Sequence, residues 1–170
     1  MEIHSNAMAA VPGLAPGSSA TVDNVLRGYA GRGVFQNYRA VAGKTGKAQF
    51  DFGWLYGQPF ALTCDVSHHR LTLTELLPCV DPDSLMYREL KAFLKGLGHV
   101  DLPDHRRVDP LLAKLAPRMR AGVVSLELSL VGDDYEYGTR KLINAAHELF
   151  LFLNEHWADY MSRNFQLNME

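Results

Sequence analysis

The feature that most limits how this chain can fold is a run of aromatic side chains at alternate positions. In the segment 50–56, FDFGWLY, single residues separate Phe50, Phe52, Trp54 and Tyr56. Successive side chains of a β-strand point to opposite faces of the sheet, so residues two apart share a face. The segment is therefore predicted to be a strand whose aromatic side is apolar.

Apolar residues also alternate with polar or small ones in the segments 60–66 and 71–74. The segments 43–46, 57–59 and 67–70 lie between the runs and are typical of turns. Connections this short join antiparallel neighbours. Residues 34–75 are therefore predicted to form a four-stranded meander, and a further alternating run at 124–130 predicts a fifth strand.

The remaining periodic segments predict helices. The spacing of apolar residues in 22–29 predicts a short helix, and the capping sequence 81–84 precedes a second helix that ends at Gly98. Asp109 and Pro110 predict a short third helix, broken at Pro117. A long final helix is predicted from about 139 to 163. The fold class is thus α+β, with an antiparallel sheet of about five strands, helices packed on one face and a long C-terminal helix.

Length and composition indicate one ordinary domain. The chain has 170 residues, 47% of them hydrophobic and 21% charged, with 17 Lys and Arg against 19 Asp and Glu. These values exclude a disordered polyampholyte and a strongly basic nucleic-acid binder. Residues 1–19 are expected to be a disordered tail and 20–170 a single domain. Ser5-Asn6-Ala7 before Met8 is typical of an expression-vector remnant, so Met8 is the expected natural start.

Nothing in the sequence addresses the chain to a membrane or to an oxidising compartment. There is no run of about 18 apolar residues that could span a bilayer, and the first residues lack the regions of a signal peptide. The two cysteines, Cys64 and Cys79, are too few for a disulfide framework. We therefore expect a cytoplasmic protein without a membrane partner.

The strand pattern also predicts a polar row on the outer face of the sheet. A loop at 57–59 places Asp51 opposite Asp65, a loop at 67–70 places Asp65 opposite Thr72, and a loop at 43–47 places Arg39 opposite Asp51. A carboxylate pair beside an arginine could bind a cation or a basic ligand. The other interpretation is a solvated ladder of charges that only supports the sheet.

Three other motifs are candidates for functional sites, and the sequence supports none of them. Gly43-Lys44-Thr45 lacks the upstream glycine and the following helix of a phosphate-binding loop, so it is interpreted as a turn. Cys64, Cys79 and the adjacent His68 and His69 lack the paired spacing of a zinc site. No nucleophile has a base placed beside it. We therefore expect no metal, no cofactor and no identifiable catalytic residue.

Charge is distributed unevenly near the end of the chain. The segment 105–120 contains five Lys or Arg residues and one acidic residue, whereas the segment 133–170 contains seven acidic residues and three Lys or Arg residues. Arg106 and Arg107 are therefore candidate binding residues for an anionic partner or RNA. The alternative is charge complementarity within one subunit or between subunits. No aromatic residues are interleaved with the basic ones, so the sequence disfavours nucleic acid as a partner.

The final helix contains the segment 149–153, LFLFL, which is apolar on every side. Such a helix must be covered from more than one direction. The sheet provides one cover, and the second is either the first two helices or a partner subunit. A homodimer whose interface includes Phe150, Leu151 and Phe152 is our expectation, because two-fold pairing is the commonest way to bury such a face.

The order of elements, with Trp157 and Tyr160 near the end of the last helix, resembles the YbjN and type III secretion chaperone-like fold over most of residues 20–165. The resemblance lies in element order and amphipathic pattern, and it implies a homodimer that binds another polypeptide without catalysis. The expected function is a non-catalytic polypeptide-binding or chaperone-like module. The alternatives are a small-molecule-binding protein or enzyme around Arg39, Asp51 and Asp65, and an RNA-associated protein.

Overall fold

The computed structural model describes residues 17–42 and 47–165. The sequence before Met8 and the turn at Gly43 lie outside these residues, so the predictions made for them have no structural counterpart here. The first described helix begins at Ser18, which places the last two residues of the expected tail inside the fold. Ser19 is buried there.

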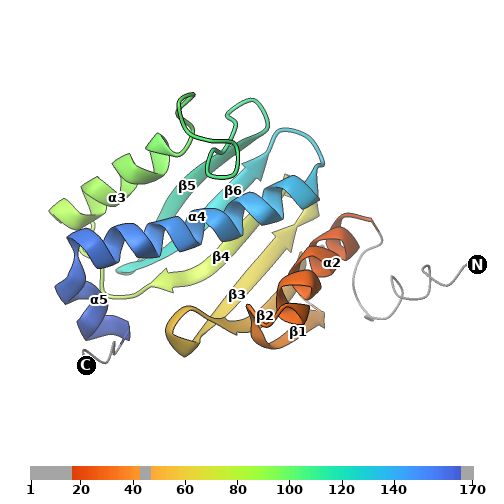
Figure 1. Ribbon diagram of the computed structural model, residues 1–170, viewed down its shortest axis with the longest axis horizontal. Coiled ribbons are helices and arrows are strands. Elements are labelled where there is room, and N and C mark those ends of the chain that lie inside the picture. The colour runs from red at the N-terminus through yellow and green to blue at the C-terminus, as the bar shows by residue number, and fades with distance from the viewer. Residues whose placement is uncertain (1–16, 43–46, 166–170) are drawn as a thin grey trace, which may run out of the picture.

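The structure confirms the α+β fold, with the helices packed on one face of an antiparallel sheet (Figure 1). The sheet has six strands in the order β1-β2-β3-β4-β6-β5. The elements in chain order are α2 (Ser18–Gly31), β1 (Gln36–Ala42), β2 (Lys47–Trp54), β3 (Gln58–Asp65), β4 (Arg70–Leu77), α3 (Leu85–Gly96), β5 (Ala113–Arg120), β6 (Val123–Leu130), α4 (Tyr135–His156) and α5 (Ala158–Phe165).

The additional strand is β5, and it corrects the prediction of a short helix that ends at Pro117. Asp109 does accept a hydrogen bond from the backbone N–H of Leu111 at 3.0 Å, but this turn does not continue as a helix. Instead β5 pairs with β6 through the two-residue turn Ala121-Gly122, whose residues have φ of 52° and 79°. Such turns match the twist of a hairpin, and a proline is tolerated in an edge strand.

The aromatic side of β2 faces the helices as predicted, and Phe50, Phe52 and Trp54 are all buried. The helix α4 crosses the same face (Figure 1). Its Gly138 permits this close approach, because a Cβ atom there would lie 2.9 Å from Leu130 and 3.1 Å from Leu71. The opposite face of the sheet carries no helix in the described part of the chain, and most of its polar residues are at least partly exposed, although Asp65 and Glu127 are buried there.

The long final helix is divided in two, contrary to the continuous helix predicted for 139–163. Trp157 interrupts it with φ of −134° and ψ of 47°, and its indole N–H donates to Glu89 of α3 at 3.0 Å. The chain then turns into α5, where the Tyr160 hydroxyl donates to the carbonyl of Pro78 at 2.5 Å. The sequence around this break contains no Gly or Pro. The break instead coincides with the contacts that Trp157 and Tyr160 make with segments distant in the sequence.

The apolar segment 149–153 receives its second cover from the same chain. Phe150 is 1% exposed and packs against Phe165 of α5, while Phe152 stacks on Phe93 of α3 with ring centroids 4.5 Å apart. Leu151 is 51% exposed. The segment's composition is thus explained without a partner subunit, and Leu151 is the residue of this segment that is most available to one. In the described ranges, no helix has the length and apolar character needed to cross a bilayer.

Candidate functional site

Arg39 and Asp51 lie opposite each other on β1 and β2, as the sequence predicted. An Arg39 guanidinium nitrogen lies 3.4 Å from Asp51 Oδ2, and the Gln49 side-chain amide donates to Asp51 Oδ1 at 2.8 Å. The Arg39 side chain is 73% exposed. An ion pair this open to water contributes less than about 1 kcal/mol to stability, so Arg39 is free to exchange Asp51 for a ligand.

Asp65 does not join this pair, which corrects the predicted row of charges. Asp51 lies opposite Ala61, and Asp65 lies opposite Lys47 on β2 and Arg70 on β4 instead of Thr72. The turn between β2 and β3 has the expected three residues, but it occupies 55–57 because Tyr56 takes a left-handed conformation with φ of 57°. Because the turn lies two residues earlier than expected, each residue of β2 pairs with a residue of β3 that is four positions earlier than expected.

Asp65 belongs to a separate cluster at the turn between β3 and β4. Its carboxylate accepts from the Ser67 hydroxyl and contacts His68 Nδ1, both at 2.8 Å, and Lys47 Nζ lies 4.0 Å away. Burial alone would raise the pKa of this carboxyl, but the hydrogen bonds from Ser67 and His68 and the nearby positive charges lower it. The carboxylate is therefore held ionised.

Ser67, His68 and Asp65 do not form a catalytic triad. The Ser67 hydroxyl lies 3.1 Å from His68 Nδ1, the same ring nitrogen that contacts Asp65. In a triad the imidazole links the serine and the carboxylate through its two different nitrogens. The three side chains therefore brace a turn instead of relaying a proton.

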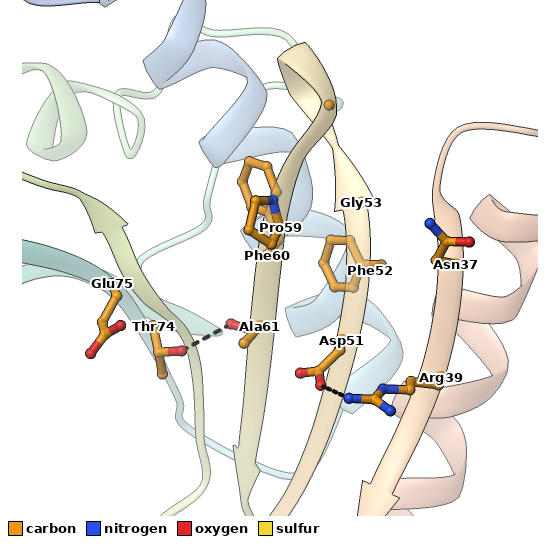
Figure 2. Close-up of a pocket in the computed structure, with 11 residues that line it drawn as sticks. Asn37, Arg39, Asp51, Phe52, Gly53, Pro59, Phe60, Ala61, Thr74 and Glu75 are labelled. Carbon is orange, nitrogen blue, oxygen red and sulfur yellow. Dashed lines mark hydrogen bonds and ion pairs between the residues drawn. The ribbon is translucent and has the colours of Figure 1, made fainter. Parts of the chain in front are cut away.

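A hollow of about 590 Å³ surrounds the Arg39–Asp51 pair on the open face of the sheet (Figure 2). It exists because β3 and β4 pair only from Leu62–Leu73 to Asp65–Arg70. Beyond that point the Thr74 hydroxyl donates to the Ala61 carbonyl at 3.3 Å and the strands separate.

The separation is continued by Glu75, which has φ of 51° and donates its backbone N–H to the Ser125 hydroxyl at 2.9 Å. Gly53, which has no side chain, and Ala61, which has only a methyl group, line the hollow and leave it open. Charged groups therefore stand on both sides of an open, solvated space, with Arg39 and Asp51 on one side and Glu75 on the other (Figure 2). The arrangement can hold a polar ligand, but it brings no activated nucleophile to it.

A second hollow, a groove of about 550 Å³, lies between α3 and the edge strand β5. The groove is mostly apolar, and its lining includes Leu94, Val108, Ala113, Leu115 and Pro117. The loop before β5 is fixed beside it, since the backbone N–H of Val108 donates to the Leu97 carbonyl at 2.8 Å. Three lysines, Lys91, Lys95 and Lys114, also line the groove.

Sequence reasoning missed this groove because it placed a helix where β5 lies. The signal that could have revealed the strand is the alternation of Lys114, Arg118 and Arg120 with Leu115 and Met119, followed by a two-residue turn that contains glycine. That pattern is typical of a hairpin strand with one apolar side.

Arg106 and Arg107 are both engaged with acids of their own chain. Arg106 Nε donates to Glu148 of α4 at 3.0 Å, and Arg107 lies 3.9 Å from Asp109. Among the other cations of the basic segment, Arg118 donates two hydrogen bonds to Glu127. These contacts favour the interpretation of the segment as charge complementarity within the subunit.

Cys64 is not a reactive thiol, and the described residues contain no metal site. Cys64 is buried beside Ser19 in the core, and burial raises the pKa of its thiol to about 11, so it stays protonated at neutral pH. In residues 17–42 and 47–165, no three His, Cys, Asp or Glu side chains are grouped so that they could hold a metal ion.

Comparisons with known proteins identify no relative of this chain. Neither protein-family models, nor curated proteins, nor solved structures give a match to the chain.

Proposed function

We propose that this protein is a non-catalytic polypeptide-binding module and that the groove between α3 and β5 holds a segment of its partner. The observation that carries the proposal is an apolar groove of about 550 Å³ beside an edge strand. Edge strands and apolar grooves are the two surfaces that domains commonly use to bind peptide segments.

The dimensions of the groove suit a short segment. The residues of α3 that line it extend from Lys91 to Lys95, about 6 Å along a helix, and Gly98 lines it just beyond the end of α3. Those of β5 extend from Ala113 to Pro117, about 13 Å along a strand. Three or four extended residues of a partner would therefore fill it, with their apolar side chains against Leu94 and Leu115.

The other hollows and clusters support a holding role over a catalytic one. The Ser67–His68 contact lacks triad geometry, and Cys64 is buried as a protonated thiol. Enzymes need a nucleophile and a base, or an equivalent pair, at a site that a substrate can reach. The resemblance in element order to the YbjN and type III secretion chaperone-like fold points the same way.

An unbiased peptide selection tests this proposal. Random peptides displayed on phage are selected against the intact protein, and the recovered peptides are titrated into isotopically labelled protein while amide chemical shifts are followed. We expect the shifts to centre on Gly98 and on 113–116. Recovery of no peptide, or shifts confined to the open face around Arg39, would overturn the assignment of the groove.

The Arg39–Asp51 hollow supports a second candidate function, the binding of a small polar ligand. Its volume of about 590 Å³ and its opposed charges at Arg39 and Glu75 favour this alternative. A thermal-shift survey of small polar metabolites tests it: a stabilising compound should lose its effect in the Arg39→Gln variant and keep it in Arg32→Gln. The homodimer stays a prediction, to be measured by sedimentation of the wild type and of Leu151→Glu.

A further inference from the structure

We infer that the segment held in the groove between α3 and β5 is acidic, with carboxylates placed against Lys91, Lys95 and Lys114 and apolar side chains against the groove. The inference rests on the proposed polypeptide-binding function and names the chemistry of the partner. Its basis is the charge around the groove, which the chain itself leaves unbalanced.

The three lysines have no acidic partner within the described residues. Lys91 and Lys95 are four residues apart on α3, so they lie on the same side of the helix, where like charges disfavour it. The ammonium group of Lys91 lies over the ring of Tyr87, 4.8 Å from its centroid. That contact leaves the positive charge uncancelled.

Three of the acids on or near these elements are engaged elsewhere. Glu89 accepts from the indole of Trp157, and Glu127 accepts from Arg118. Asp109 accepts from the backbone N–H of Leu111 and lies 3.9 Å from Arg107. The positive potential over the groove is therefore available to a ligand.

This imbalance contrasts with three arginines of the basic segment 105–120, because Arg106, Arg107 and Arg118 each pair with a carboxylate. The apolar walls of the groove strengthen the contrast, since charges beside a low-dielectric surface interact more strongly than charges surrounded by water. A partner that brings carboxylates would gain from Lys91 and Lys95 on α3. Lys114, which alternates with Leu115, adds its charge at the edge of β5.

Protection of an exposed strand edge could explain a lysine on β5, because such charges discourage pairing between sheets. It explains Lys114 only, because Lys91 and Lys95 lie on α3. Interaction with the helix dipole could account for Lys95, which lies in the last turn. Neither explanation covers Lys91, and an acidic ligand covers all three.

The test titrates three capped pentapeptides into the full-length protein and follows amide chemical shifts. The probes are Leu-Asp-Leu-Glu-Leu, its neutral counterpart Leu-Ser-Leu-Gln-Leu and its basic counterpart Leu-Lys-Leu-Arg-Leu. We expect the acidic peptide to bind about tenfold more tightly than the neutral one at low salt, with the advantage shrinking at about 0.5 M salt. Shifts should include Gly98 and Ala113.

Lys91 at the groove and Arg32 away from it each place a positive charge over a tyrosine ring, which makes their variants a matched pair. Lys91 lies over the ring of Tyr87, and Arg32 lies over the ring of Tyr29 with a distance of 5.0 Å to the centroid. Lys91→Glu should weaken the acidic peptide and strengthen the basic one, whereas Arg32→Glu should change neither. The double variant Lys91→Gln/Lys95→Gln removes charge without reversing it and should bring the acidic peptide close to the neutral one.

The possible results distinguish the acidic partner from polypeptide binding in general. Equal binding of the acidic and neutral peptides overturns the acidic partner but leaves polypeptide binding in place. Failure of all three peptides, together with failure of the phage selection, overturns the proposed function as well. Tighter binding of decanoate than of the acidic peptide, with the same shifts, would make the ligand a small anionic amphiphile. Self-association that Lys91→Glu abolishes would make the occupant a second copy of this chain. Either of these last two results overturns the inference.

Discussion

Replacing Phe150 by alanine separates the two explanations of the apolar segment 149–153. In the structure its side chain is 1% exposed, and its ring centroid lies 6.1 Å from that of Tyr56, 6.0 Å from Phe60 and 5.3 Å from Phe165. Truncation of a buried phenylalanine to alanine costs about 3–5 kcal/mol. Because three rings from three segments lose a packing partner, we expect Phe150→Ala to lower the free energy of unfolding by about 4 kcal/mol.

The neighbouring variant Leu151→Ala is the control. That side chain is 51% exposed, so its truncation should change the free energy of unfolding by less than about 0.5 kcal/mol. Urea unfolding of both variants, measured at two protein concentrations, checks the difference. With a urea dependence of about 1–3 kcal/mol per M for a domain of this size, Phe150→Ala should move the midpoint by more than about 1 M.

The reasoning is refuted if Phe150→Ala unfolds at the wild-type urea concentration. It is equally refuted if the loss of stability depends on protein concentration, because unfolding is concentration-dependent only where a partner subunit stabilises the fold. The ring would then be covered by a second copy of the chain and not by α5 and the sheet.

Three further predictions concern the core, the turns and acid stability. Iodoacetamide at about pH 8 should alkylate the exposed Cys79 and spare Cys64, whose pKa is raised to about 11 by burial, and peptide mass spectrometry showing equal labelling would contradict this. The lowered pKa of Asp65 stabilises the fold fully above the unfolded-state value of about 4, and this stabilisation is lost as pH falls through the lower folded-state pKa. Asp65→Asn should therefore flatten the acid limb of the stability profile, and an unchanged acid limb would disprove the role of this carboxylate. Gly122→Ala places a side chain at φ of 79° and should cost about 1 kcal/mol by thermal unfolding; an unchanged melting temperature would show that the turn can relax.

The alternating pattern predicted the faces of the strands correctly even where it predicted the pairing wrongly. The turn between β2 and β3 lies two residues earlier than expected, so the pairing shifts by four, an even number that keeps Phe52 and Cys64 on the buried face. Tyr56 is not a residue type that marks a left-handed turn. Its conformation follows from its place in the fold, where its ring stacks on that of Phe150.

The candidate sites were predictable where neighbouring residues determine the structure and unpredictable where contacts between distant residues determine it. The Arg39–Asp51 pair was predictable because one short connection sets the β1–β2 register. The groove beside β5 was not, because Asp109-Pro110 is a local helix signal that the hairpin with β6 overrides. The break at Trp157 was hidden for a similar reason, since its hydrogen bond to Glu89 joins residues far apart in the sequence.

The charge on β5 also restricts how two copies of this chain could associate. In a two-fold dimer each edge strand would meet its own copy, so pairing through β5 would bring Lys114, Arg118 and Arg120 near the same residues of the other subunit. Pro117 would further remove a backbone donor from such a pairing. Association through this edge is therefore disfavoured, whereas a short acidic segment meets no such repulsion. If the chain does form a homodimer, the exposed Leu151 of α4 is a better contact than β5, and the groove stays open to a different polypeptide.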